Sequence, residues 1–396
     1  MAGGTPGFSG QRLQEAREAR GLSAVTMAEI LGVTRQLIYE YESDEVAPPP
    51  DKLYIIAAKL GVPVGFFVQQ PRPSAETTVF YRSLASATKP ARSKAEARLR
   101  WLGDIVEYLA AFVEFPLADF PDLPMSRRIP LPMSEIEEAA KATRRHWALG
   151  DGPISNVVWL LESKGAVGTR GIIETETIDA FSTWMGEPTR PCLFLGADKD
   201  SAARSRFDAA HELAHAVIHR RVRRSQLSGG AEHKAIEADA NRFASAFLLP
   251  AASFPFDLRA PSLQAMVIAK ARWVVSVGAM IHRLADLDAI TEDEAARLWI
   301  ARSRRHWAKH EPLDDELPPE QPRSLSSAIM LVINEGVRTK DQICSELVRE
   351  PADIECLAGL PAGYFGNEPA PLRLVDRLSP VSRSAGEPGE IVHFPR

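Results

Sequence analysis

Residues 206–219 read RFDAAHELAHAVIH, and this stretch sets the expectations for the rest of the chain. His211 and His215 stand four residues apart, and Glu212 directly follows the first histidine. On an α-helix, residues four apart differ by about 40° in direction and by one turn in height, so both imidazoles can reach one metal ion. A third protein ligand is needed before this pattern becomes a site.

The stretch AIEADANRFASAFLLP, predicted to form the next helix, supplies that ligand. Glu237 and Asn241 are four residues apart and share one helix face. Asp239 points about 200° away from Glu237 on an ideal helix, which makes Asp239 the weaker choice. We therefore predict Glu237 as the third ligand and Asn241 as the group that orients a ligating histidine.

Zn²⁺ is the ion expected at this site, because it accepts neutral imidazole and carboxylate ligands. His211, His215 and Glu237 would hold it and leave one coordination position open for water. Glu212 is placed to take a proton from that water and to deliver it later to the leaving amine. A glutamate ligand on a helix soon after HExxH is the arrangement of gluzincin peptidases.

Three further polar residues lie near the motif. His219 completes a third turn on the same face and is expected to support the ligands rather than to bind the metal. Asp208 could orient His211, but a solvated carboxylate in the first turn is the favoured interpretation. His233 is expected in a polar loop and is assigned no role.

Residues 1–70 are predicted to form five short helices, with Ser23 and Thr34 as N-caps and Gly32 in a tight turn. The pieces GVTRQLIYEYE and LGVPVGFF resemble the lambda-repressor-like (XRE) helix-turn-helix domain. This resemblance implies that the second helix of the motif enters the DNA major groove. The residues expected to contact DNA are Thr34, Arg35, Gln36 and Tyr39.

The net charge of this first region argues against DNA binding. Residues 1–70 contain six basic and eight acidic side chains, so counterion release contributes little to DNA affinity. The alternative is a dimerisation or protein-recognition module with the same fold. The basic run KPARSKAEARLR at 89–100 is expected to be a solvated helix face, and it could instead supply positive charge to the first region.

The central region is predicted to be a zincin-like domain, in which a small, mainly antiparallel sheet packs beside the HExxH helix. Ser134 and Glu137 have the spacing of a capping box at the start of its first helix. The runs RSRFDAAHELAHAVIH and EADANRFASAFLLP resemble the ImmA/IrrE family of metallopeptidases. Ala214 stands where these proteins usually have glycine, and alanine is compatible with a helix.

Proline-rich stretches divide the chain, and the fold class expected is α+β, mostly α. The predicted domains are a helix-turn-helix domain at 1–72, a helical and proline-rich linker at 73–133, a metallopeptidase domain at 134–255, and a helical C-terminal domain at 256–396. The C-terminal domain is expected to bind a partner, to dimerise or to sense a signal, and residues 324–365 could form a second helix-turn-helix-like bundle. A basic cluster in this domain is a further possible nucleic-acid face; it comprises Arg302, Arg304, Arg305, His306 and Lys309.

Composition limits the remaining choices. The net charge is -5, and the three cysteines form no CxxC pair, which favours a reducing cytoplasm over a disulfide framework. No stretch has the roughly 18 apolar residues of a membrane span, and the first residues lack the apolar segment of a signal peptide. We therefore expect a cytoplasmic protein, bacterial by its resemblance, that does not bind membranes and forms a homodimer.

Two functions follow from these expectations. The resemblance implies a zinc endopeptidase fused to a DNA-binding domain that cleaves a specific protein, typically a repressor or antitoxin-like regulator. The alternative is a transcription regulator or antitoxin whose peptidase-like domain senses a signal or binds a partner without proteolysis. A zinc site kept for stability alone is disfavoured, because a structural site has no use for Glu212.

Overall fold

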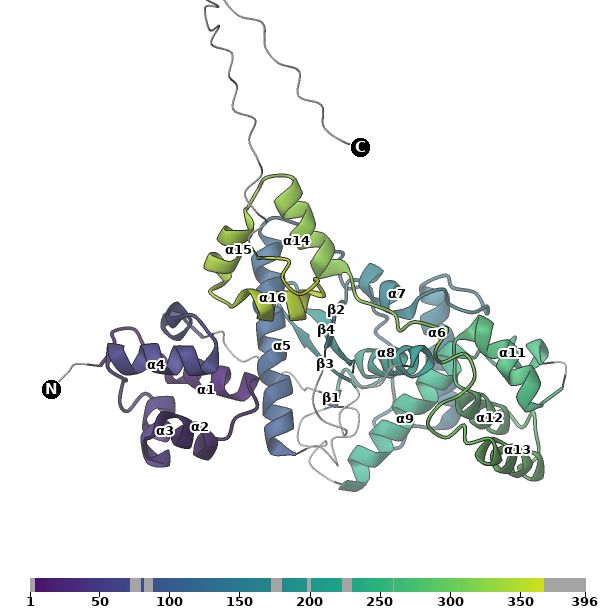
Figure 1. Ribbon diagram of the computed structural model, residues 1–396. Coiled ribbons are helices and arrows are strands. Elements are labelled where there is room, and N and C mark those ends of the chain that lie inside the picture. Colours follow the sequence, from purple (N-terminus) through teal and green to yellow (C-terminus); the bar gives the residue numbers. More distant parts are fainter. Residues whose placement is uncertain are drawn as a thin grey trace, which may run out of the picture. The chain divides into compact units, whose positions relative to one another are not determined.

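The computed structural model describes residues 4–71, 80–81, 88–171, 180–197, 201–222, 230–258 and 260–366. It confirms an α+β fold that is mostly helical, with one small sheet (Figure 1). Residues Met1–Phe365 form one compact unit. The elements described below all belong to that unit.

The first five elements form the predicted helix-turn-helix bundle. They are α1 (Gly10–Ala19), α2 (Ala24–Leu31), α3 (Arg35–Glu42), α4 (Pro50–Leu60) and the 3-10 helix η1 (Val64–Val68). The Ser23 hydroxyl accepts the Thr26 N–H at 3.0 Å, and the Thr34 hydroxyl accepts the Leu37 N–H at 3.2 Å. Gly32 has a φ of 64°, a left-handed conformation that glycine adopts without steric cost. Local sequence therefore fixes this motif.

Helix α5 (Lys89–Ala110) corrects the expectation of a linker with a solvated basic face. Trp101 and Leu102 are fully buried, and even Lys94 is buried. Arg100 pairs with Glu18 of α1 at 3.4 Å, so its charge is used inside the molecule. The helix lies between α1 and the sheet (Figure 1). Its buried apolar residues are more numerous than those on the single buried face of a surface helix.

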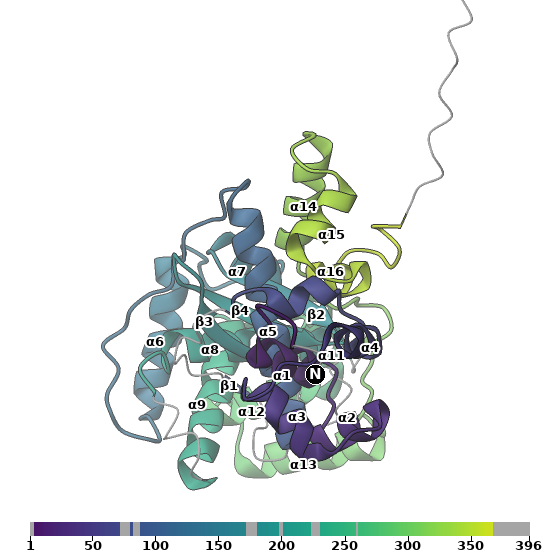
Figure 2. The same ribbon diagram turned by 90° about the vertical axis from the view of Figure 1, so that its left-hand side faces the viewer.

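The central region holds α6 (Met133–His146), α7 (Val157–Ser163), β2 (Val167–Gly171), β3 (Ala180–Met185), β4 (Arg190–Gly196), α8 (Ala202–Val217) and α9 (Gly230–Leu248). With β1 (Phe80–Tyr81), the strands form a sheet in the order β1-β3-β4-β2. The expected strands at 166–174 and 177–185 extend into residues 172–179, which lie outside the described residues. Both ribbon views place α8 beside β3 and β4 (Figures 1 and 2).

The expectation of an antiparallel sheet holds for two of its three strand pairs. Strand β3 runs antiparallel to β1 and to β4, but β2 runs parallel to β4. Strands β3 and β4 form an antiparallel hairpin, β1 pairs with the outer side of β3, and β2 pairs with the outer side of β4. The chain reverses direction twice between β2 and β4, once on entering β3 and once on leaving it, so β2 and β4 point the same way.

The sheet separates two hydrophobic cores. On β4, Cys192 and Phe194 face the core shared with α1, α5 and the helices of residues 324–358, whereas Leu193 and Leu195 face the core shared with α6–α9. This alternation is the two-residue period of a strand buried on both sides. Phe181 stacks on Phe194 across β3 and β4 with ring centroids 4.8 Å apart.

The start of α6 differs from the predicted capping box. The helix begins at Met133 after Pro132, with no side-chain cap. Glu137 instead forms a bidentate ion pair with Arg283, whose second hydrogen bond measures 2.9 Å. A long-range partner therefore replaces the local cap, because a fully buried guanidinium must be neutralised.

The central core continues beyond the expected boundary at residue 256. It is closed by α10 (Phe254–Asp257), α11 (Leu263–Trp273), α12 (Val277–Asp286) and α13 (Glu292–Arg304). Met266, Trp273 and Met280 of these helices are buried in the same hydrophobic core as the buried residues of α8 and α9. Within the described ranges no single helix is long and apolar enough to cross a membrane. Helices α11 and α12 taken together have the length and composition of a membrane span, but they are bent by 104° relative to each other.

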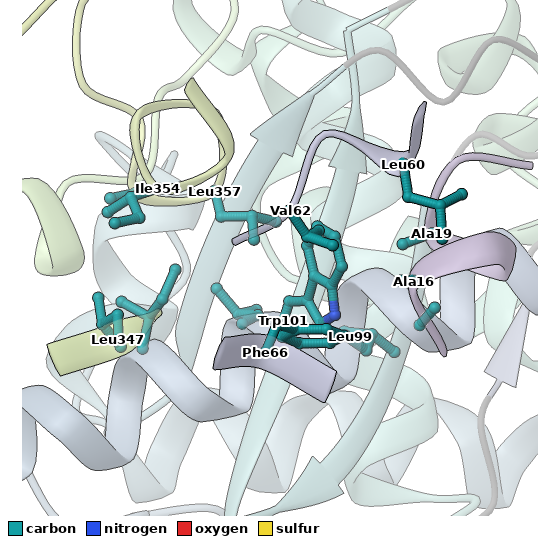
Figure 3. Packing of buried hydrophobic residues seen from close by; sticks show 14 of the residues in the cluster. Ala16, Ala19, Leu60, Val62, Phe66, Leu99, Trp101, Leu347, Ile354 and Leu357 are labelled. Carbon is teal, nitrogen blue, oxygen red and sulfur yellow. The ribbon is translucent and has the colours of Figure 1, made fainter. Parts of the chain in front are cut away.

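The last helices are α14 (Ser324–Asn334), α15 (Lys340–Leu347) and α16 (Pro351–Ala358). Helices α15 and α16 are joined by a three-residue turn that begins at Val348 with φ 51°, as in a helix-turn-helix. The second helix of this pair is not free: Ile354 and Leu357 are buried near Trp101 and Phe66 (Figure 3). The bundle therefore closes the first core.

Candidate metal centre

Helix α8 is held deep in the molecule by its alanines and by one buried ion pair. Six alanines of α8 are buried, and their small side chains allow the sheet and α9 to approach closely. Arg206 binds Glu320 with its Nε at 2.8 Å, and Glu320 also accepts the backbone N–H groups of Val157 and Val158. These contacts fix the helix that carries the histidines.

Three side chains from α8 and α9 converge at the centre. The Nε2 atoms of His211 and His215 lie 3.0 Å apart, and the Glu237 carboxylate lies 3.3 Å from the first and 3.5 Å from the second. All donor atoms of this group lie within 4.8 Å of one another. Tetrahedral zinc ligands are separated by about 3.3–3.6 Å, so this donor set fits zinc.

A second layer of side chains orients the two histidines. Asn241 Oδ1 lies 3.0 Å from His211 Nδ1, and His219 Nδ1 lies 2.9 Å from His215 Nδ1. Burial, reinforced by the charge of His215, holds the pKa of His219 well below its ordinary value of 6.5. A neutral His219 can accept or donate a hydrogen bond toward His215.

Glu212 is completely buried beside the three donors. Its carboxylate accepts a hydrogen bond from the Ser182 hydroxyl of β3. Sequence reasoning missed Ser182, since a serine on a strand 30 residues before the motif carries no signal of this contact. The sheet thus supplies a group that holds Glu212 in place.

His233 is the second residue whose place was not foreseen. It lies on α9 rather than in a loop, is buried, and has its Nε2 3.8 Å from Glu237. Its position four residues before Glu237 on one helix was the available signal. Asp239, the weaker ligand candidate, lies outside the donor group and accepts the Leu131 N–H at 2.8 Å.

Two carboxylates illustrate how burial acts around the centre. Asp208 is buried in the middle of α8, which corrects the interpretation as a solvated first-turn residue. Burial of Glu237 acts to raise its pKa, but the hydrogen bonds from His211 and His215 outweigh burial and lower the pKa of Glu237. Glu237 is therefore ionised over the physiological range, as a metal ligand must be.

The residues expected to contact DNA lie together on α3. Thr34, Arg35, Gln36 and Tyr39 are all exposed at the start and along one face of α3. The Arg35 guanidinium lies 5.1 Å from the Tyr39 ring, and Gln36 donates to Glu40 at 3.2 Å. The structure brings these four side chains together on one accessible face.

Comparison with known families identifies both regions. The family model for the IrrE N-terminal-like domain, a peptidase family, matches residues 168–285. The helix-turn-helix family model matches residues 13–67. No curated protein matches the chain. The protein therefore combines an N-terminal helix-turn-helix domain of the XRE type with a central domain of the IrrE-like peptidase family.

Proposed function

We propose that the protein is a zinc-dependent endopeptidase with a DNA-binding domain, and that it cleaves a repressor or antitoxin-like regulator. The observation that carries this proposal is the convergence of His211, His215 and Glu237 within 4.8 Å, beside the buried carboxylate of Glu212. A site used only for stability has no need of a carboxylate that is not a ligand. Its presence supports catalysis.

In this proposal each side chain has one role. His211, His215 and Glu237 would hold a zinc ion, which would supply Lewis-acid chemistry and make the loss of a proton from water easier at neutral pH. Glu212 takes the proton of the attacking water and later gives it to the leaving amine. Ser182 keeps the Glu212 carboxylate in one orientation by its hydrogen bond.

The DNA-binding half of the proposal concerns α3. Its exposed Arg35 and Gln36 are residue types that read base edges in the major groove. The acidic balance of residues 1–70 predicts weak non-specific affinity, so binding would depend on a specific site. A cytoplasmic protein that recognises an operator and cleaves a regulator bound nearby accounts for the fusion of both domains.

One observation favours a second function, in which the peptidase-like domain senses a signal or binds a partner without proteolysis. His211, Glu212 and His215 are each at most 1% exposed. A peptide cannot reach side chains so enclosed unless the surrounding chain moves. Under this alternative the centre binds zinc and stays closed.

The test compares wild type with Glu212→Gln, which removes the base and keeps the shape. Zinc is measured by elemental analysis, and cleavage is measured on the protein encoded next to its gene. Stoichiometric zinc in both, with cleavage only by wild type, is expected. Zinc in both without cleavage by wild type would favour the sensor, and absence of zinc from wild type would contradict both functions.

A further inference from the structure

A cavity of about 650 Å³ lies where α8, α9, α12 and α13 meet, in the central domain. Pockets that bind small molecules and cofactors have volumes of roughly 300–1,000 Å³. Asn241, the residue in contact with His211, lines this cavity, whereas the three metal-binding candidates do not. The cavity is therefore separate from the metal centre and adjacent to it.

The floor of the cavity is a closed network of opposite charges. Buried Glu311 accepts hydrogen bonds from Lys270 at 3.2 Å and from Arg302 at 3.0 Å. Asp314 accepts from Lys270 at 2.7 Å. Two carboxylates thus face two cations, so the floor contributes almost no net charge to a bound molecule.

The walls carry a positive excess. Arg242 of α9 and Lys309, which follows α13, line the cavity with exposed side chains. Asp286 is the only carboxylate lining it outside the floor network among the described residues. Two exposed cations from different elements against this one carboxylate favour an anionic ligand.

Aromatic rings complete the lining. Trp299 and Trp307 are each half-buried in the cavity wall. The His282 ring is tilted by 56° against the Trp299 ring, with centroids 4.8 Å apart, and the Arg302 guanidinium lies over the Trp299 ring, 5.4 Å from its centroid. The Arg305 guanidinium lies over the Trp307 ring at 5.7 Å. Each indole ring therefore has a cation over one face, and a planar ring can stack only on the opposite face.

We infer that this cavity binds a mononucleotide, with its base against the tryptophans and its phosphate toward Arg242 and Lys309. The combination of fixed indole rings, a cationic wall and hydroxyl or amide groups such as Ser245 and Asn241 matches base, phosphate and sugar. A purely apolar ligand would make no contact with the charge of Arg242 and Lys309, and inorganic phosphate would leave the rings unused.

Asn241 connects this site to the metal centre. A ligand that hydrogen-bonds to Asn241 competes with the contact that orients His211. Bound nucleotide is therefore expected to change the rate at which a chelator removes zinc from the protein. This second consequence rests on the proposed zinc site, whereas nucleotide binding itself does not.

The first experiment measures binding of AMP, adenosine and ribose 5-phosphate to the full chain by calorimetry. Adenosine lacks the anion and ribose 5-phosphate lacks the base, so each is expected to bind about tenfold more weakly than AMP. Equal binding of AMP and either fragment, or no binding of AMP at millimolar concentration, would overturn the inference.

The second experiment uses Arg242→Glu, an exposed charge reversal, with Arg145→Glu on the exposed surface of α6 as the matched control. Arg242→Glu should weaken AMP binding about tenfold or more and leave adenosine binding unchanged, because it removes the phosphate contact. Thermal unfolding establishes that both variants are folded. Wild-type AMP affinity in Arg242→Glu, or equal loss in Arg145→Glu, contradicts the assignment.

Discussion

The candidate metal centre and helix α3 present the side chains proposed to be functional in opposite ways. His211, Glu212 and His215 are buried, and each is held by a residue from elsewhere in the chain or from the next helical turn. Arg35 and Gln36 are exposed; the Arg35 guanidinium lies near the Tyr39 ring and Gln36 donates to Glu40, both on the same helix.

Under the proposed function, this difference follows from what each region would bind. A metal ion and a bond-breaking step require donors fixed within a fraction of an ångström, which burial and second contacts provide. A DNA groove is contacted by long, exposed side chains that can adjust to phosphates and base edges. Substitutions at the centre should therefore have large effects, and substitutions on α3 should have smaller ones.

The largest effect is expected for Glu212→Gln. Loss of the general base should lower the rate of substrate cleavage by about 10²–10⁴-fold while zinc content stays at the wild-type level. The rate is measured by gel-based cleavage of the partner protein. Glu232→Gln, at an exposed glutamate of α9, is the control and should cleave normally. Normal cleavage by Glu212→Gln would remove this residue from the mechanism.

The next effect concerns the support of a ligand rather than the ligand itself. Asn241→Ala should weaken zinc affinity by about 10–100-fold, because His211 loses the group that fixes its ring. Competition with a chromophoric chelator measures the affinity. The same substitution at exposed Asn334 should leave it unchanged. Equal affinity in Asn241→Ala and wild type would show that burial alone orients His211.

A smaller effect is expected on the exposed surface. Arg35→Ala should weaken operator binding about tenfold, the loss of one base or phosphate contact. Fluorescence anisotropy with operator DNA at fixed salt measures it. Arg304→Ala, at an exposed residue of the basic cluster on α13, serves as the control. If Arg304→Ala lost operator binding and Arg35→Ala bound normally, the DNA-binding surface would lie on α13.

The smallest effect concerns the cap of α3. Thr34→Ala removes the acceptor for the Leu37 N–H and should lower the free energy of unfolding by about 1 kcal/mol. Urea unfolding measures this change. Thr34→Ser keeps the hydroxyl and should be close to wild type, so equal stability of both variants would contradict the role of the cap.

The α15–α16 bundle sharpens the same comparison. It has two eight-residue helices and a left-handed turn residue, like α2 and α3. Yet Asp353 of α16 pairs with Arg20 at 2.6 Å, and the helix packs on the first core. A helix-turn-helix geometry therefore does not by itself predict a DNA surface, since the second helix must also be accessible.

The sequence by itself determined those features whose physics is local. Helix periodicity set His211 and His215 on one face and chose Glu237 over Asp239. Caps and a glycine turn defined α2 and α3, because these interactions span at most four residues.

The tertiary structure alone decided the contacts between distant segments. Ser182 donates a hydrogen bond to Glu212, 30 residues further along the chain. Glu137 pairs with Arg283 instead of forming the predicted capping box, and α5 is largely buried instead of solvated. The parallel pairing of β2 with β4 has the same origin. Such pairings depend on how whole elements fill two cores, and no short-range pattern in the chain encodes them.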